Sequence, residues 1–494
     1  MDFLKGLIRG KDHEYTPLQE PGVDSRRRQM ATIRRRRIFV FGGLTALITV
    51  LILVFSHRQD TSGCEETASC RDASGQTWGQ YSPVFSVPSE IDPSIPDGCD
   101  VNLAIVLSRH GARDPTASKA VVYKALIDKI QSFAEDYAKG FEFIRDYQYT
   151  LGADQLSWFG EKQLVDSGVA FYERYKSLAT DGEPFIRAAG QERVVGSARN
   201  FTQGFLNAQG RDEADAIKDI LIIPEAGGVN NTLNHGTCPE FEHGAADDVA
   251  PEKQEVWKEI WVPSITERLN RKMPGANLTL DETIFMMDLC PFDTVAGRGD
   301  KMSQFCQLFT AREWEQYDYF MSLDKWYGYG EGNPLGPTQG VGYVNEVISR
   351  LTGEPVDDHT TTNSTLDSSP ETFPLNRSLY ADFSHDNDMS SIYAALGLYA
   401  GVGDLDPARR EPPQDKGGFS AAWTVPFAAK MYVERMVCGE GEGEGEEMVR
   451  VLVNDRVIPL SGCGADSSGR CRLSDFVDSL SFARNGGKWD ECFT

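Results

Sequence analysis

Residues Val101–Thr116 read VNLAIVLSRHGARDPT, and this stretch decides the fold that the sequence predicts. Between Val101 and Leu107 the only polar residue is Asn102, and a short apolar run of this kind is typical of a central strand in a parallel sheet. Open α/β sheets bind their ligands beyond the carboxyl ends of the strands. The sequence therefore predicts an α/β fold with a binding site directly after this strand.

A histidine between two arginines occupies that place. Arg109, His110 and Arg113 arrive together just after Leu107. An imidazole can act as a nucleophile, and the planar guanidinium group matches the geometry of a phosphate. The stretch therefore predicts an anion site, with phosphate as the favoured anion.

Two further strand ends carry charged residues. Leu379–Phe383 is a candidate strand followed by Ser384, His385 and Asp386. Glu183–Ala189 is another, with Arg193 in the turn toward the next helix. A lone histidine is more often structural than catalytic. The chain has only seven histidines, so two of them just past strand ends beside charged residues indicate one shared site.

These side chains supply each part of a phosphoryl transfer from an ester. His110 is the predicted nucleophile, which forms a phosphohistidine while the carbonyl group of Gly111 holds its other ring nitrogen. Asp386 is predicted to protonate the leaving group and then to activate the attacking water. The predicted phosphate clamp consists of Arg109, Arg113, Arg193 and His385. This scheme needs no metal and no cofactor.

A binuclear metal site is the alternative use of these residues, with His110, His385 and several Asp side chains as ligands. The flanking guanidinium groups disfavour it, because they repel a divalent cation. The sequence does not indicate a serine hydrolase, because the nucleophile motif G-x-S-x-G is absent.

The charge of the chain argues against a nucleic-acid partner. The formal net charge is -25, and the first 58 residues hold 11 Lys and Arg against 5 Asp and Glu, which leaves 38 basic against 69 acidic residues beyond them. Nucleic-acid binding by counterion release needs a basic surface. A small phosphorylated substrate is still compatible, because a few local arginines outweigh a diffuse negative field.

An uncharged apolar stretch near the N-terminus predicts a membrane anchor. Residues 38–56 are long enough to cross a bilayer as a helix, and arginine clusters in residues 1–37 indicate a cytoplasmic tail. The prediction is a single-pass type II membrane protein with its catalytic domain outside the cytoplasm, at the cell surface, in the secretory pathway or in a vacuole lumen. A cleaved signal peptide is the alternative, although its apolar region is usually shorter and nearer the terminus.

The rest of the chain divides by composition. Residues 57–98 are rich in Ser, Pro, Asp and Gly and are predicted as a stalk and N-terminal extension, whose cleavage would release the domain. The phosphatase-like domain is expected over 99–494, with a helical insertion over roughly 222–333. Helical spacing covers Lys119–Phe143, and Glu331–Tyr343 is a Gly- and Pro-rich loop that either cradles an anion or connects back to the sheet.

Cysteines and sequons agree with an extracytoplasmic domain. Ten cysteines, all after residue 63, indicate an oxidising compartment. The close pairs are Cys64 with Cys70, Cys290 with Cys306, and Cys463 with Cys471. The five Asn-x-Ser/Thr sequons are at Asn200, Asn230, Asn277, Asn363 and Asn376.

The motifs RHGARDPT and SHDND resemble those of the histidine acid phosphatases, and the surrounding sequence is similar to that of the fungal phytases. The likeness also covers WGQYSPVFS, LGADQLSWFGEKQLVDSG, PFIRAAGQERVVGSARNF, NPLGPTQGVGY, FSAAWTVPFA and VLVNDRVIPLSGC. It implies an α/β sheet domain with a mainly helical second domain and the active site between them. It also implies the two-step mechanism above and a phytase of the 3-phytase type.

The resemblance assigns further residues. It matches Arg193 to the third phosphate-binding arginine, leaves Arg187 as strand support, and gives Lys119 and Lys325 to an outer pocket that binds substrate. The implied disulfides are Cys64–Cys70, Cys99–Cys438, Cys238–Cys492, Cys290–Cys306 and Cys463–Cys471.

Three departures from the family pattern matter. Asp114 stands where an aromatic residue is common, and basic outer-pocket positions hold Val122 and Asp324. The third departure is the anchor, since relatives are typically secreted and free. We expect hydrolysis of phytate and of simpler phosphate monoesters at acidic pH, with weaker phytate selectivity. The alternatives are an acid phosphatase with little phytate preference and a non-catalytic receptor for inositol phosphates.

Overall fold

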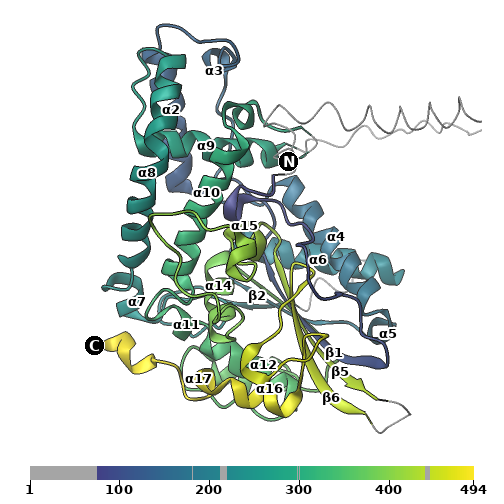
Figure 1. Cartoon of the computed structure of the whole chain (residues 1–494). Helices are drawn as coiled ribbons and strands as arrows, with labels where there is room; N and C mark the ends of the chain where they lie inside the picture. Colours follow the sequence, from purple (N-terminus) through teal and green to yellow (C-terminus); the bar gives the residue numbers. More distant parts are fainter. Residues whose placement is uncertain (1–74, 181, 212–219, 298, 300, 440–444) are drawn as a thin grey trace, which may run out of the picture. The chain divides into compact units, whose positions relative to one another are not determined.

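The core of the fold is a mixed sheet. The computed structural model describes residues 75–494 apart from 181, 212–219, 298, 300 and 440–444, and these residues belong to one compact unit. Within them, eight strands are ordered β3-β2-β4-β1-β5-β6-β7, with β8 paired to β6 (Figure 1). The strands are β1 (Cys99–Arg109), β2 (Phe185–Ala189), β3 (Leu221–Ile223), β4 (Leu379–Ser384), β5 (Lys430–Cys438), β6 (Glu446–Val453), β7 (Arg456–Val457) and β8 (Arg470–Arg472).

The strand that leads to the predicted nucleophile has a different kind of neighbour on each side. β1 pairs in parallel with β4 and antiparallel with β5. The predicted parallel sheet is therefore correct for the half β3-β2-β4-β1 only, because the β5–β6 hairpin adds antiparallel strands beyond β1. Arg109 lies opposite Ser384 in the parallel register, so the next residues, His110 and His385, leave adjacent strands at the same level.

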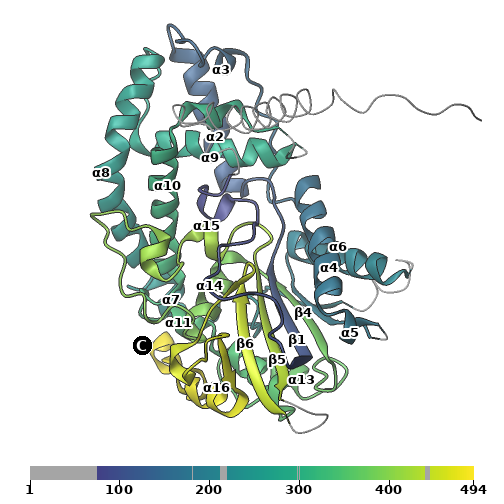
Figure 2. The ribbon, with the colours of Figure 1, turned by 45° about the vertical axis from the view of Figure 1, so that its right-hand side comes forward.

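Helices cover both faces of the sheet. Successive side chains of a strand point to opposite faces, and on β4 the ring of Phe383 meets Phe201 while the Asp382 carboxylate accepts a hydrogen bond from Tyr343. The first face is covered by α4 (Trp158–Arg174) and α6 (Glu192–Gln209), and the second by α12 (Val341–Thr352), α14 (Asp386–Ala395) and α16 (Leu473–Ser479) (Figures 1 and 2).

A group of longer helices stands beyond the carboxyl ends of β1 and β4 (Figures 1 and 2). Its members are α2 (Ala117–Phe133), α8 (Val249–Lys272), α9 (Leu280–Ala296) and α10 (Ala311–Asp324). Thr279 and Thr310 each begin a helix with a reciprocal capping box, which fixes where α9 and α10 start. The mainly helical second part that the resemblance implies is thus present.

Short α-helices connect the longer elements. They are α3 (Phe143–Asp146), α5 (Lys176–Ala179), α7 (Pro239–His243), α11 (Gly336–Gln339), α13 (Ser364–Asp367), α15 (Ala421–Thr424) and α17 (Ser481–Arg484). Two predictions need correction here. The helix predicted over Lys119–Phe143 ends at Phe133, because Ala134 has an extended backbone, and the predicted loop Glu331–Tyr343 contains α11 and the start of α12.

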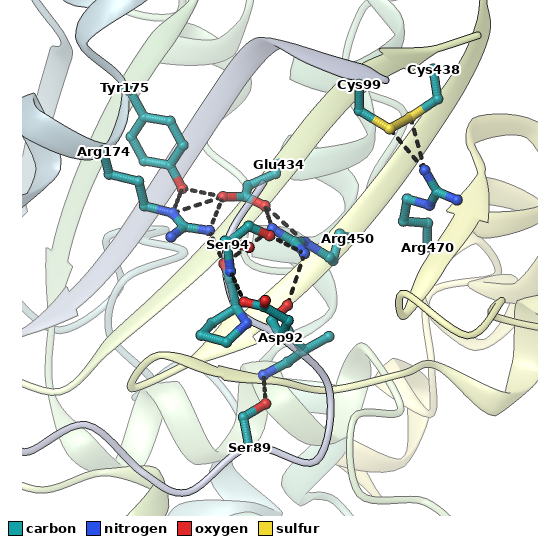
Figure 3. A network of polar contacts seen from close by, with 12 residues as sticks. Ser89, Asp92, Ser94, Cys99, Arg174, Tyr175, Glu434, Cys438, Arg450 and Arg470 are labelled. Carbon is teal, nitrogen blue, oxygen red and sulfur yellow. Dashed lines mark hydrogen bonds and ion pairs between the residues drawn. A yellow bond between two sulfur atoms is a disulfide. The ribbon is translucent and has the colours of Figure 1, made fainter. Parts of the chain in front are cut away.

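The segment before β1 belongs to the packed fold. Trp78 is buried, so the domain begins before the predicted boundary at Cys99. We call residues 75–98 the N-terminal arm. Figure 3 shows how the arm is held: Arg450 donates to the carbonyl oxygen of Ser94 at 2.9 Å, and both Arg450 and Arg174 pair with the fully buried Glu434. Because a buried carboxylate needs such partners, this network ties the arm firmly to the sheet.

Four disulfides support the same framework. They are Cys99–Cys438, Cys238–Cys492, Cys290–Cys306 and Cys463–Cys471, each as the resemblance implies. The predicted tail, membrane span and Cys64–Cys70 pair lie outside the described residues. Within the described residues, no helix combines the length and the apolar character that crossing a bilayer requires.

Candidate active site

His110 lies at the end of β1 and is almost completely buried. Its Nδ1 is 2.8 Å from the carbonyl oxygen of Gly111. A carbonyl group only accepts hydrogen bonds, so Nδ1 carries the proton and Nε2 keeps its lone pair. Glycine is required at position 111, because a Cβ there would collide with the carbonyl oxygen of Gly160 in α4. The backbone thus presents an unprotonated imidazole nitrogen.

Arg109 is held in place by the chain on several sides. Its Nη1 donates to the carbonyl oxygens of Gln80 in the N-terminal arm and of Val425, the latter at 2.8 Å. The ring of Phe427 lies 4.6 Å from its guanidinium carbon. Its Nη2 is 3.2 Å from Oδ1 of Asp386. Burial, opposed by Asp386, lowers the pKa of Arg109 to about 10, so the group stays charged at physiological pH.

Asp386 is the first residue of α14 and sits between two cations. Its Oδ2 is 2.9 Å from Nζ of Lys325, and its Oδ1 faces Arg109. Burial alone raises the pKa of the Asp386 carboxyl, but the charges of Arg109 and Lys325 outweigh it and hold the pKa well below its usual range. Without a bound phosphate, Asp386 is therefore a carboxylate.

The remaining predicted residues surround the His110 ring. The ring of His385 lies 5.7 Å from that of His110, measured between centroids. Burial and the surrounding positive charges hold the pKa of the His110 imidazole well below its usual value. Those charges are on Arg109, Arg113, Arg193 and His385. The structure thus brings together the side chains that follow three different strands.

The three clamp arginines keep buried donors that make no hydrogen bond within the described residues. These donors are the Nε atoms of Arg109, Arg113 and Arg193, and the carboxylate paired with Arg193 is that of Asp154, at 3.6 Å. Buried guanidinium donors of this kind are costly unless a ligand satisfies them. An anion bound beside His110 is the kind of ligand that they fit.

The predicted outer lysines differ in position. Lys325 is buried at the start of the π-helical turn η6 (Lys325–Tyr329), where Nζ also donates to Asn387 at 2.6 Å, so it acts on Asp386 directly. Lys119 is partly exposed, with Nζ 4.6 Å from the ring centre of Phe285 and 4.0 Å from the buried carboxylate of Asp288. Only Lys119 thus has the exposure expected of an outer-pocket cation.

Asp114 has a structural partner. Its Oδ1 accepts a hydrogen bond from the backbone N–H of Gly152 at 3.0 Å, and its own N–H donates to Gln155. Burial raises the pKa of its carboxyl group. Asp114 therefore fastens the loop before α4, in addition to placing a charge near Arg113. Arg187, assigned to strand support, is buried and paired with Asp382 and Glu346.

Several residues of the site were not predicted from the sequence. They are Gln80, Glu225, Asn387, Val425 and Phe427. Gln80 and Val425 contribute only backbone carbonyls. Every residue has such a carbonyl, so the residue type cannot predict this role. Glu225 follows the short strand β3, and only the strand order β3-β2-β4 shows that it lies near His385.

The chain belongs to the histidine phosphatase superfamily (branch 2), whose sequence pattern matches residues 100–454. Individual relatives agree over nearly the whole chain. It is 48% identical to phytase A of Aspergillus oryzae over 460 residues, which cover 91% of this chain and 97% of that protein. It is 51% identical to phytase A of Emericella nidulans over 443 residues, which cover 86% and 94% of the two chains.

Solved structures share the fold. The phytase from D. castellii has a TM-score of 0.68 at 23% identity and covers 86% of this chain and 89% of its own. A multiple inositol polyphosphate phosphatase from Bifidobacterium longum, in complex with inositol hexasulfate, has a TM-score of 0.60 at 14% identity and covers 82% and 97% of the two chains. These likenesses establish the α/β architecture with its helical second part.

Proposed function

We propose that this protein is a phytase that hydrolyses phytate and other phosphate monoesters through a phosphohistidine. The observation that carries the proposal is the pairing of His110 with Asp386 across Arg109, with Nδ1 of His110 bound to Gly111. The family and the extensive identity to phytase A relatives support the same activity.

In the first step, Nε2 of His110 attacks phosphorus and the P–O bond to the leaving alcohol breaks. The positive donors of the clamp stabilise the phosphoryl oxygens during transfer. Asp386 gives its proton to the departing oxygen. In the second step, Asp386 takes a proton from water, whose oxygen attacks the phosphohistidine, and phosphate and free His110 are released.

Asp386 must be protonated to act in the first step, although its pKa is low in the empty site. A bound phosphate brings negative charge next to Arg109 and competes for that guanidinium group. Removing the favourable field of a cation raises the pKa of a carboxyl group. Substrate binding therefore prepares the acid, and acidic solution favours the same form.

The nucleophile is suited to acidic pH. Because the pKa of His110 is held well below its usual value, its Nε2 stays unprotonated as the pH falls below the ordinary range of histidine. The clamp arginines stay charged throughout. The acid-active enzyme predicted from the sequence thus has a physical basis in burial and positive charge around His110.

A large cavity borders the clamp and leaves room for the rest of a substrate. It has a volume of about 870 Å³, includes Arg193, and is also lined by the acidic residues Asp154, Glu161 and Glu192. Acidic walls disfavour a substrate with many phosphates relative to a simple monoester. This supports a broad phosphomonoesterase with weak selectivity for phytate.

We expect kcat/KM values for phytate and p-nitrophenyl phosphate, both measured at acidic pH, to agree within about tenfold, or about 1.4 kcal/mol of transition-state binding. A preference for phytate well above tenfold would refute the broad specificity, but it would still agree with the proposed phytase activity. If purified wild type binds inositol hexakisphosphate but hydrolyses neither compound, the protein is a receptor and the proposed enzyme is wrong.

We further propose the membrane organisation predicted from the sequence: a cytoplasmic tail (1–37), a membrane helix (38–56), a stalk and the N-terminal arm (57–98), and an extracytoplasmic domain. The four disulfides support an oxidising location. Asn277 and Asn376 are exposed and suit glycosylation, whereas the other sequons are partly buried. These others are Asn200, Asn230 and Asn363.

The anchor is tested by fractionating cells that express the full chain. We expect it to stay in the membrane pellet after an alkaline wash, and a variant that replaces residues 1–56 with a cleavable signal peptide to be secreted in active form. Full-length chain in the soluble fraction, or removal of the apolar stretch by signal peptidase during export, contradicts the anchor, whereas later cleavage within the stalk does not.

A further inference from the structure

A carboxylate without a role in the mechanism above contacts the second histidine of the site. Oε1 of Glu225 is 3.0 Å from Nε2 of His385, and both side chains are only 9% exposed. Glu225 lies just after β3, whereas His385 follows β4. A fourth strand end therefore reaches the site.

Glu225 is itself held by the start of α6. Its Oε1 accepts the backbone N–H of Gln191 at 3.1 Å, and its Oε2 accepts from Nε2 of Gln191 at 2.7 Å. Gln191 is the residue before α6, whose first turn carries Arg193. One carboxylate thus links the phosphate-binding histidine to the helix that presents a clamp arginine.

The contact decides the state of the His385 ring. A carboxylate only accepts hydrogen bonds, so Nε2 of His385 carries a proton, and Nδ1 is the one ring nitrogen left for a phosphate. Burial raises the pKa of Glu225, but its bonds with His385 and Gln191 outweigh this and lower it, so the charge persists at acidic pH.

We propose that Glu225 is a positioning residue, which fixes the ring of His385 through its Nε2–H and the start of α6 through Gln191, so that His385 and Arg193 keep a fixed relation around the substrate phosphate. The proposal rests on the proposed function, since it gives His385 its part in phosphate binding. Other charged groups also act on this pair. They are His110, Arg193, His235 and Asp388.

Glu225→Gln tests the charge while keeping a hydrogen-bond acceptor. We expect kcat/KM for p-nitrophenyl phosphate to fall about 10- to 100-fold, as for the loss of a charge-assisted hydrogen bond. Inorganic phosphate should inhibit more weakly. Glu313→Gln is the matched control, because it removes the charge of an α10 carboxylate that is 14% exposed and paired with Arg268 of α8.

A double-mutant cycle shows whether Glu225 acts through His385. In a His385→Asn background, Glu225→Gln should lower kcat/KM much less than in the wild type, and it should no longer weaken inhibition by phosphate. Full additivity, or unchanged inhibition by phosphate in a folded Glu225→Gln protein, overturns the proposal. Glu225→Asp keeps the charge but shortens the side chain, so it should weaken phosphate inhibition less than Glu225→Gln does. The same double-mutant cycle with Glu225→Asp is the test if Glu225→Gln does not fold.

Failure of this proposal is distinct from failure of the proposed function. An inactive wild type refutes the phosphatase itself. An active wild type whose kcat/KM and phosphate inhibition are unchanged in Glu225→Gln refutes only the positioning role.

Discussion

We expect His110→Ala to abolish turnover of both phytate and p-nitrophenyl phosphate. The substitution removes the proposed nucleophilic atom, Nε2, and no other side chain of the proposed mechanism can replace it. Loss of a nucleophile from a catalytic group that acts as a unit costs on the order of 10⁴- to 10⁶-fold in rate. The measurement is steady-state release of phosphate at acidic pH, with the variant's thermal unfolding compared with the wild type.

The covalent intermediate gives an independent readout. Rapid quenching of the wild type with labelled substrate should trap a phosphorylated protein that is labile to acid, and His110→Ala should trap none. His243→Ala is a suitable control, because His243 is exposed at the end of α7 and should leave the rate unchanged. Trapped label in His110→Ala would show that another residue is the nucleophile.

Asp386→Asn separates the two steps. The amide can neither donate the carboxyl proton nor take one from water, so we expect kcat for phytate to fall about 10²- to 10⁴-fold. p-Nitrophenolate leaves without a proton, so the first turnover with that substrate is affected less than the hydrolysis of the phosphohistidine. Stopped-flow measurement should therefore show a burst of about one equivalent of nitrophenolate per active site, followed by slow turnover.

The comparison variant for this experiment is Asp324→Asn. Asp324 also pairs with Lys325, with its Oδ2 3.0 Å from Nζ. Unlike Asp386, it has no ion pair with Arg109 among the described residues, and we do not propose it as the acid. We expect it to change kcat far less and to show no burst. An Asp386→Asn protein with nearly normal steady-state turnover would exclude Asp386 as the acid and base.

The parts of the site that follow strand ends were predictable from local sequence. A buried apolar run leads directly into His110, and a second leads into His385 and Asp386. Because parallel strands end at the same edge of a sheet, sequence order alone was enough to expect these side chains together. The resemblance then distinguished Arg193 from Arg187. In the structure, Arg187 forms a buried ion pair with Asp382 of β4.

The remaining parts depend on three-dimensional neighbours that no local pattern contains. The antiparallel pairing of β5 with β1 was not predicted, because the sequence of a single strand does not determine whether its neighbour is parallel or antiparallel. Gln80 contributes a backbone carbonyl from a segment that composition presents as a stalk. Lys325 was expected in an outer pocket, and its burial against Asp386 follows from the π-helical turn that ends α10.

The central position of β1 has a consequence for how the chain is made. Synthesis completes β1 early, but its two neighbours, β4 and β5, begin only at Leu379 and Lys430. Until they are synthesised, both edges of this apolar strand are unpaired, and Cys99 has no disulfide partner, because Cys438 lies 339 residues further along the chain. Such delayed, long-range pairing slows folding and exposes the chain to aggregation. Production of active protein should therefore depend more on chaperones and disulfide isomerase than on the stability of the finished fold.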